Sequence, residues 1–456
     1  MLAAAPTWHQ LGELAKQTAA KMGADVMAVA GRRCSTAEFA AEGPPSAQSL
    51  LRTFGAAPED VRITLYRDTH AWCPYCHKVW MQLEEKRLPY RVEKINMNCY
   101  GPKKQSFLRI TRGQGMLPVL EIDGRVTTES SVIMQELEEC FPEATPMLPP
   151  RGSAGRKASD AGMAMERDLF GSWLRWLRAD ESPRARKSFE QALDRTDARL
   201  AASGPFFGGA SVSLVDCVFA SSLERISASI LYYKGLQVKA SGRWPHVDSW
   251  FVHMESRDTY RATQSDYHTH VHDLPPQIGG CLASGTPEQI AAAASIDGTD
   301  GTAWKLPLQP SALEPLPVGE VPEADRAEAA LALIRHHENI VASSAAATGS
   351  EPGAADAAFR AAVGALLHVN GVPTAGTATE EDEGAATAAA ALRYTRDRIC
   401  VPRDMGLGAA RQLRAHLNFV ADEIDPGGLG PSVAITTRDR KDVDPTRFGT
   451  QNAAAM

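Results

Sequence analysis

Several features that would mark a membrane, secreted or nucleic-acid-binding protein are missing from this sequence. It contains no run of about 18 consecutive apolar residues, the length that a helix needs to cross a bilayer, so no membrane span is expected. The first residues lack the basic and apolar segments of a secretory signal peptide, which argues against secretion. Lysine and arginine total 48 against 55 aspartates and glutamates, and a net charge of −7 argues against a nucleic-acid partner. The hydrophobic content of 44% is sufficient for two or three domains with proper cores.

Cysteine patterns are also scarce, with one exception. Six of the eight cysteines stand singly, at Cys34, Cys99, Cys140, Cys217, Cys281 and Cys400. The other two form the tetrapeptide Cys73-Pro74-Tyr75-Cys76. Scattered cysteines suit a reducing compartment, in which such a pair can turn over against glutathione. A zinc site would need a second pair, so a redox or glutathione site is favoured over two zinc ligands or an inert buried pair.

The tetrapeptide lies where a strand pattern changes into a helix pattern. Apolar residues alternate from Val61 to Leu65, and after Pro74 they recur at helical spacing. Cys73 is therefore expected at a helix N-terminus, where unpaired N–H groups and the helix dipole lower a cysteine pKa below its free value of about 8.5. Cys76 falls one turn into the same helix, where burial makes it less reactive. From there it can form a disulfide with Cys73 or resolve a mixed disulfide.

The residues after the tetrapeptide predict the rest of a small α/β domain. Further strands are predicted at residues 90–95 and 117–122. Asp123-Gly124 then predicts a hairpin turn, because this pair readily takes positive φ angles, and a returning strand follows at 125–128. Glu129-Ser130 begin an apolar periodic stretch that predicts a closing helix. The predicted order is strand, helix, strand, connection, strand, strand, helix.

This order and three of its motifs resemble the thioredoxin-like domain of the glutathione transferases. The motifs are Cys-Pro-Tyr-Cys at 73–76, Met-Leu-Pro-Val at 116–119 and Glu-Ser at 129–130. A cysteine at the first helix is similar to the omega, dehydroascorbate reductase and related glutaredoxin-like classes. The resemblance covers residues 60–280. The whole chain also resembles long plant and algal members of the family, which share the segment Ala-Trp-Cys-Pro-Tyr-Cys and a helical C-terminal extension.

The resemblance implies a set of site residues and glutathione as the cosubstrate. Cys73 and Cys76 are the implied catalytic residues, and a second cysteine is closer to dithiol glutaredoxins, which leaves a disulfide mechanism open. The implied glutathione-binding residues are Tyr75, Lys104, Leu117, Pro118, Glu129 and Ser130.

Most of these glutathione-binding positions carry a specific implied contact. Pro118 is expected to be cis, so that the preceding Leu117 pairs its backbone with the cysteinyl part of glutathione. Glu129 and Ser130 correspond to the pair that holds the γ-glutamyl end. Lys104 corresponds to a lysine that contacts the glycyl carboxylate, and its neighbour Lys103 is the alternative.

The fold class that follows is an α/β thioredoxin-like N-terminal domain, an all-α glutathione-transferase C-terminal domain and an additional helical extension. The expected boundaries are an N-terminal helical extension at 1–58, the thioredoxin-like domain at 59–142, a linker at 143–158, the all-α domain at 159–280, an irregular arm at 281–320, the helical extension at 321–425 and a tail at 426–456. The linker is rich in Pro, Gly and Ser, and the extension carries alanine-rich helical patterns.

Two groups of residues in the second domain receive structural interpretations. Ser213 and Asp216 have the form of an N-capping box and are expected to be structural. The aromatic residues Phe170, Trp173 and Trp176 are expected to pack in the core, with one of them at the edge of a substrate pocket.

Three alternating histidines follow in the same domain, at His268, His270 and His272. In an extended segment they would share a face, and three imidazoles can bind zinc or copper. No carboxylate or cysteine pattern nearby completes a known metal spacing. A buried or capping polar cluster is therefore favoured, and no metal is expected.

The function that these patterns favour is a glutathione-dependent thiol transferase or reductase acting through a Cys73 thiolate. Glutathione conjugation to electrophiles and a noncatalytic glutathione-binding scaffold, with the extension as its working surface, are the alternatives. The expected partners are glutathione and a thiol, disulfide or electrophilic acceptor, without nucleic acid, and a homodimer is an open possibility. The expected compartment is the cytoplasm or the plastid stroma.

Overall fold

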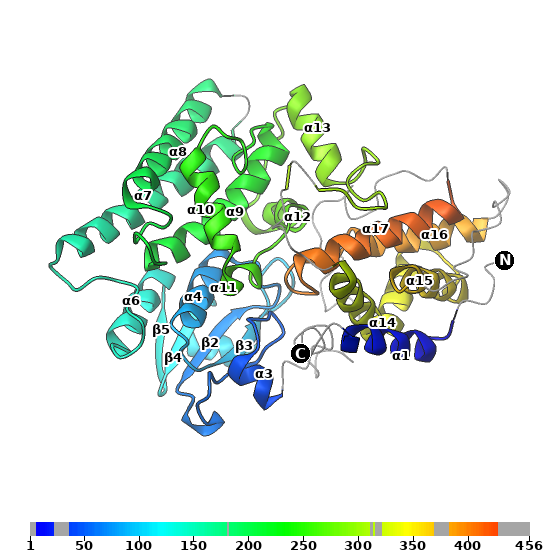
Figure 1. Ribbon diagram of the computed structural model, residues 1–456, viewed down its shortest axis with the longest axis horizontal. Helices are drawn as coiled ribbons and strands as arrows, with labels where there is room; N and C mark the ends of the chain where they lie inside the picture. Colours follow the sequence, from blue (N-terminus) through cyan, green and yellow to red (C-terminus); the bar gives the residue numbers. More distant parts are fainter. Residues whose placement is uncertain are drawn as a thin grey trace. The chain divides into compact units, whose positions relative to one another are not determined.

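The computed structural model describes residues 6–21, 36–179, 182–310, 313–314, 322–368 and 383–426 (Figure 1). The predicted tail after residue 426 and the single Cys34 lie outside these residues. The chain divides into two compact units. The sheet-containing unit comprises Cys34–Ala293 and Ala312–Pro317, and the helical unit comprises Met1–Arg33, Ala294–Ser311 and Val318–Ala455.

One five-stranded sheet forms the centre of the sheet-containing unit, in the order β1-β3-β2-β4-β5. The strands are β1 (Leu51–Arg52), β2 (Ile63–Asp68), β3 (Tyr90–Ile95), β4 (Val119–Ile122) and β5 (Arg125–Thr128). Strand β2 pairs with β3 in parallel and with β4 antiparallel, and β4 pairs with β5 across the Asp123-Gly124 turn. The predicted order is confirmed. Within the N-terminal helical extension predicted at 1–58, the strand β1 adds an edge strand to β3, because its two residues pair with Tyr90 and Arg91.

Four of the described helices accompany the sheet, namely α3 (Ala37–Glu42), which contacts β1, α4 (Pro74–Glu85), α5 (Gln105–Ile110) and α6 (Ser130–Cys140). Helix α4 packs against both β2 and α6. Its Val79, Trp80 and Leu83 are buried, as their helical spacing predicted. Packing against the sheet and α6 therefore fixes the position of helix α4, whose first turn contains the tetrapeptide.

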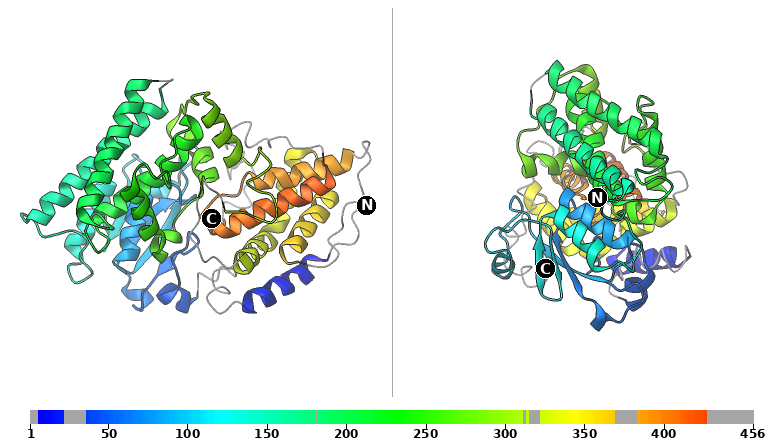
Figure 2. Two further views of the ribbon diagram at one scale, coloured as in Figure 1. Left: turned by 45° about the horizontal axis from the view of Figure 1, so that its top comes forward. Right: turned by 90° about the vertical axis from the view of Figure 1, so that its left-hand side faces the viewer.

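A helical layer completes this unit with α7 (Ala154–Leu177), α8 (Pro183–Ser203), α9 (Leu214–Lys234), α10 (Pro245–Glu255), α11 (Asp258–Arg261) and α12 (Tyr267–Ile278). The long helices α7 and α8 lie side by side (Figure 2). Helix α9 is buried along its whole length and packs against α4, α7 and α12. It begins with the predicted capping box, in which Ser213 and Asp216 bond to each other's backbone. Helix α7 starts at Ala154, so the expected linker ends earlier than predicted.

The alternating histidines lie in helix α12 and not in an extended segment. In the helix His268 and His272 lie one turn apart on the same face, with 4.6 Å between their ring centroids, and His270 points in a different direction. All three side chains are buried. His270 approaches Glu224 of α9, with 3.5 Å between Nε2 and Oε2.

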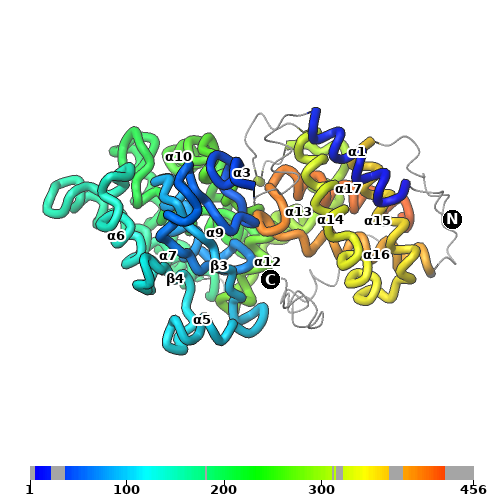
Figure 3. Tube along the Cα trace, turned by 90° about the horizontal axis from the view of Figure 1, so that it is seen from below, coloured from blue at the N-terminus to red at the C-terminus, as the bar shows by residue number. Residues whose placement is uncertain are grey.

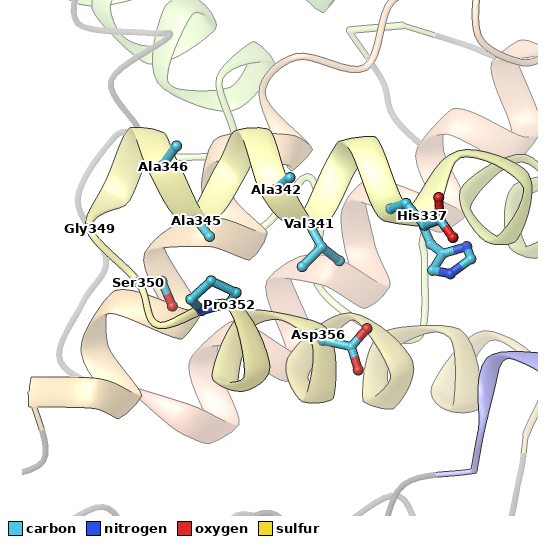
Figure 4. A pocket seen from close by; sticks show the side chains of 10 residues that line it. His337, Val341, Ala342, Ala345, Ala346, Gly349, Ser350, Pro352 and Asp356 are labelled. Atoms are coloured by element: carbon cyan, nitrogen blue, oxygen red, sulfur yellow. The ribbon is translucent and has the colours of Figure 1, made fainter. Parts of the chain in front are cut away.

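The helical unit consists of α1 (Trp8–Lys21), α14 (Pro322–Thr348), α15 (Pro352–Leu366), α16 (Glu383–Arg396) and α17 (Leu407–Ile424), and Figure 3 shows α1 beside α14. Trp8 anchors α1, because its Nε1 donates to Asp356 at 2.6 Å and its ring lies 4.4 Å from that of His337. Between α14 and α15 lies a hollow of about 610 Å³ (Figure 4), lined by residues that include Val341, Ala345 and Pro352.

An irregular arm and the absence of a membrane span were also predicted from the sequence. The arm predicted as irregular at 281–320 contains the helix α13 (Pro287–Ile296), so that prediction is wrong over these residues. Among the described helices, none combines the length and the apolar character required to span a bilayer.

Candidate functional site

Sheet pairing brings the predicted motifs to one edge of the sheet. Strand β2 ends at Asp68 and leads into the loop before Cys73. Because β4 runs antiparallel to β2, with Val119 opposite Tyr66, the start of β4 lies beside the end of β2. Because β5 runs antiparallel to β4, with Thr128 opposite Val119, the end of β5 lies at the same edge. The tetrapeptide, Leu117-Pro118 and Glu129-Ser130 therefore meet there.

Cys73 is the N-cap residue of α4, and Pro74 occupies the first helical position, where its missing N–H costs nothing. The side chain of Cys73 is 9% exposed and that of Cys76 is 2% exposed. Both are free thiols. The thiol that is closer to the surface is therefore the one at the helix start, as the sequence predicted.

The hydrogen bonds at the helix start distinguish the two thiols. The Cys76 side chain, with the backbone N–H groups of Tyr75 and Cys76, lowers the pKa of Cys73, although burial and the Asp68 carboxylate act in the opposite direction. Burial, followed by the Cys73 and Asp68 charges, raises the pKa of Cys76 well above its usual value. Cys73 is therefore the thiol that ionises first, and Cys76 keeps its proton.

Asp68 organises the loop that precedes the tetrapeptide. Its Oδ2 accepts from the backbone N–H of Trp72 at 2.7 Å and from that of Cys73 at 3.1 Å. The carboxylate is wholly buried, and one of its oxygens and both cysteine sulfurs lie within 4.8 Å of one another. The motifs in the sequence did not indicate Asp68. The available signal was an acid at the end of the strand that leads to the cysteines.

The peptide bond between Leu117 and Pro118 is cis, as the resemblance implied. Glu129 takes a φ of 67°, which is uncommon for a residue with a side chain, and it directly precedes α6. Such backbone conformations cluster at functional sites. The Glu129 side chain is exposed and Ser130 is buried at the first turn of the helix.

The two neighbouring lysines differ in environment. Lys104 is the exposed N-cap residue of α5. Lys103 is half-buried and donates from Nζ to the carbonyl of Gly115. Burial lowers the pKa of Lys103, and the Cys73, Cys76 and Cys99 thiols act in the opposite direction. Lys103, the alternative to Lys104, is thus held at Gly115, and the charges of the tetrapeptide cysteines act on it.

Aromatic and charged side chains form a wall beside Cys73. Tyr75 is 46% exposed, and its ring lies 6.3 Å from that of Phe170 on α7. Lys78 Nζ lies 5.3 Å from the Tyr75 ring centroid. Burial, followed by the charges of Cys73, Glu166 and Glu129, raises the pKa of Tyr75. The Tyr75 hydroxyl therefore lies close enough to Cys73, Glu166 and Glu129 to be affected by their charges.

The predicted aromatic residues of α7 divide into two kinds. Trp173 and Trp176 are buried, and Trp173 Nε1 donates to Ser229 of α9 at 2.9 Å. They pack the core, as predicted. Phe170 is only partly buried and contacts Tyr75, so it is the member that edges the site.

Comparison with known proteins gives the family of this chain. Residues 72–140 match the model "Glutathione S-transferase, N-terminal domain", and residues 169–252 match "Glutathione S-transferase, C-terminal domain". Glutathione S-transferase DHAR2 of Arabidopsis thaliana is 30% identical over 196 residues, which cover 42% of this chain and 84% of that protein. Glutathione S-transferase omega-1 of Mus musculus is 27% identical over 178 residues, covering 38% and 70%.

Among solved structures, the dehydroascorbate reductase of Chlamydomonas reinhardtii is 22% identical, with a TM-score of 0.41, and the match covers 48% of this chain and all of that one. The family matches fall within the sheet-containing unit, which holds the tetrapeptide and the helical layer. The chain is an enzyme of the glutathione S-transferase family, with a cysteine at the start of its first thioredoxin-like helix.

Proposed function

We propose that this protein is a glutathione-dependent thiol transferase or reductase in which Cys73 is the reacting thiol. The observation that carries the proposal is the contrast between the two cysteines. The pKa of Cys73 is lowered at the start of α4, whereas that of Cys76 is raised by burial. A thiolate is the nucleophile in thiol exchange, so a site of this kind favours attack by Cys73.

In deglutathionylation, the Cys73 thiolate attacks the glutathione sulfur of a mixed disulfide. A bond forms between Cys73 and glutathione, and the acceptor leaves as a thiolate that takes up a proton. A second glutathione thiolate then attacks the Cys73-bound sulfur, which releases oxidised glutathione and restores Cys73. Deglutathionylation consumes one free glutathione, because the other half of the oxidised glutathione comes from the mixed disulfide. Reduction of a two-electron acceptor that carries no glutathione consumes two.

Cys76 offers a second route for release. After losing its proton, its sulfur attacks Cys73, which forms an intramolecular disulfide and frees glutathione. The raised pKa of Cys76 makes this route slow at neutral pH. We therefore assign the first route to normal turnover.

Glutathione is proposed to lie along the sheet edge that carries the three motifs. Glu129 and the N-terminus of α6 suit the charged γ-glutamyl end, since an acid meets its ammonium and the helix start meets its carboxylate. The Leu117 backbone suits the cysteinyl part, and the Lys103 ammonium suits the glycyl carboxylate.

The reducing compartment proposed for this reaction is the cytosol or the plastid stroma. Relatives of this chain carry both designations, since one protein of Arabidopsis thaliana is named chloroplastic and one of rice is named cytosolic. The proposed assembly is a homodimer or monomer of the full chain, which gel filtration with light scattering would distinguish.

Three assays on the wild type and on Cys73→Ser and Cys76→Ser test the proposal. They measure reduction of a glutathionylated peptide, reduction of dehydroascorbate, and conjugation of an aromatic electrophile. We expect Cys73→Ser to lose the reductions and Cys76→Ser to keep them. Conjugation that survives in Cys73→Ser, without any reduction in the wild type, would instead favour a conjugating enzyme. Glutathione binding without turnover in any assay would favour a scaffold.

A further inference from the structure

Arg225 of α9 reaches from the helical layer to the loop before Cys73. The residue is 1% exposed. Nη1 donates to the carbonyl of Ser221, one turn earlier on the same helix, at 2.6 Å, and Nη2 donates to the carbonyl of Trp72. The guanidinium carbon also lies 4.9 Å from the centroid of the Trp72 ring.

These contacts hold one peptide plane from both sides. The carbonyl of Trp72 and the N–H of Cys73 belong to the same peptide group, which is planar. Arg225 donates to the carbonyl, and Asp68 accepts from the N–H at 3.1 Å. Because the plane can rotate only if one of these bonds breaks, the direction in which the Cys73 side chain leaves the backbone is set by Asp68 and Arg225 together.

The charge of Arg225 persists despite burial. Burial lowers the pKa of Arg225, while Glu224, Cys73 and Asp68 act in the opposite direction. An arginine side chain starts from a pKa above about 12, so it stays protonated across the working range. The guanidinium is therefore a buried cation bonded to the residue before Cys73, and it also faces the Glu224 carboxylate, with 3.7 Å between Nη1 and Oε2.

Neighbouring groups on α4 and α12 do not replace this charge. His77 and His270 both face Glu224, at 3.7 Å and 3.5 Å. Burial lowers the pKa of His77 to about 4 and that of His270 well below its usual value, so both rings are neutral at neutral pH. The titratable or charged groups that surround the site from the packed elements are Asp68, Tyr75, Cys76, His77, Lys78, Lys103, Glu129, Glu166, Glu224, Tyr260 and His270.

We propose that Arg225 is a positioning residue that fixes the Trp72–Cys73 peptide and whose buried positive charge stabilises the Cys73 thiolate. The inference rests on the proposed function, in which Cys73 is the reacting thiol. Arg225 would thus contribute in two ways, by fixing the position of Cys73 and by supplying a positive charge, and two substitutions separate these effects. Lysine keeps the charge but lacks the fork that reaches two carbonyls, and methionine removes both.

The test compares Arg225→Lys and Arg225→Met with the wild type in the full chain. The first measurement is the rate at which iodoacetamide alkylates Cys73 as a function of pH, read from the mass of the Cys73 peptide. We expect the midpoint of Arg225→Met to rise by about one pH unit, which means about tenfold slower alkylation below the midpoint. We expect the pH midpoint of Cys73 alkylation in Arg225→Lys to stay within about 0.3 pH units of the wild-type value.

The second measurement is the split between kcat and KM in deglutathionylation. Arg225→Lys is expected to lose about tenfold in kcat with an unchanged KM for glutathione, because a misplaced thiol reacts poorly with correctly bound substrate. The matched control is Arg414→Lys in the helical unit, where a side chain that is also 1% exposed donates to the carbonyl of Ile399 at 2.8 Å. This control is expected to lose stability without a change in the alkylation midpoint.

Either of two results would overturn the inference. One is that Arg225→Met is folded, as judged by a wild-type near-UV circular dichroism spectrum, and its Cys73 alkylates with the same pH midpoint as in the wild type. The other is a wild-type kcat in Arg225→Lys, and this result decides the matter if the methionine variant does not fold. Alkylation requires no turnover, so a failure of the proposed function, seen as full activity in Cys73→Ser, is recognised separately.

Discussion

The buried carboxylate of Asp68 accepts a hydrogen bond from the backbone N–H of Cys73 at 3.1 Å. The same oxygen accepts from Trp72 at 2.7 Å, so one acid fixes two consecutive N–H groups ahead of α4. Its charge also opposes ionisation of Cys73. Asp68 therefore fixes the conformation of the loop before α4, while its negative charge raises the pKa of Cys73.

Substitutions at Asp68 are expected to separate these two effects. Asp68→Asn keeps an oxygen that can accept from the loop but removes the charge, so the pH midpoint of Cys73 alkylation should fall below the wild-type value. Asp68→Ala leaves two buried N–H groups without an acceptor and should lower the free energy of unfolding by about 1–3 kcal/mol. Urea unfolding and alkylation measure the two quantities. A higher midpoint in Asp68→Asn would contradict this account.

The pH dependence of the two thiols is expected to differ. The lowered pKa of Cys73 means that its thiolate is present below the ordinary midpoint of about 8.5 and is lost as the pH falls through the lowered value. Cys76 should stay unmodified until much higher pH, because its pKa is raised. Alkylation of each cysteine peptide across pH checks this order. Equal midpoints, or Cys76 reacting first, would be inconsistent with it.

The two lysines before α5 provide a matched pair for glutathione binding. Lys103→Ala is expected to raise the KM for glutathione about tenfold, because it removes a half-buried charge near the cysteines. Lys104→Ala, at the exposed neighbouring position, is expected to change the KM by less than about twofold. Steady-state kinetics with varied glutathione checks both values. A larger increase in KM for Lys104→Ala than for Lys103→Ala would instead assign glutathione binding to Lys104, the position that the family resemblance implies.

The capping box of α9 is expected to govern stability and not the thiol. Asp216 accepts from the backbone N–H of Ser213 at 2.8 Å, from that of Phe207 at 2.9 Å and from Trp250 Nε1 at 2.9 Å. Asp216→Ala should therefore cost about 2–4 kcal/mol of unfolding free energy, against about 1 kcal/mol for Ser213→Ala. Urea unfolding measures the difference. Equal costs would mean that the contacts outside the box contribute little.

Local patterns predicted the frame of this site. The alternation from Val61 and the helical spacing after Pro74 placed Cys73 at a strand-to-helix junction, and strand β2 and helix α4 lie there. The Asp123-Gly124 turn and the helix after Glu129 were equally local signals. Such features depend on residues within one or two turns, so a single sequence contains them.

The parts that were missed depend on distant partners. Arg225 lies 153 positions from Trp72, and nothing in the α9 pattern indicates that its side chain reaches the tetrapeptide loop. Strand β1 is two residues long and exists because it pairs with β3, and α13 was hidden by surrounding Pro and Gly residues. Tertiary packing, which local spacing does not encode, decides the Arg225 contact and the existence of β1.

The central claim is that glutathione is transferred onto the sulfur of Cys73. The most direct test mixes Cys76→Ser protein with a glutathionylated peptide in the absence of free glutathione and maps the product by mass spectrometry. Without glutathione or Cys76 to release it, the adduct should accumulate as one glutathione on Cys73, with one equivalent of peptide thiol released. Release of the peptide thiol with glutathione found on another residue, or on none, would contradict the claim.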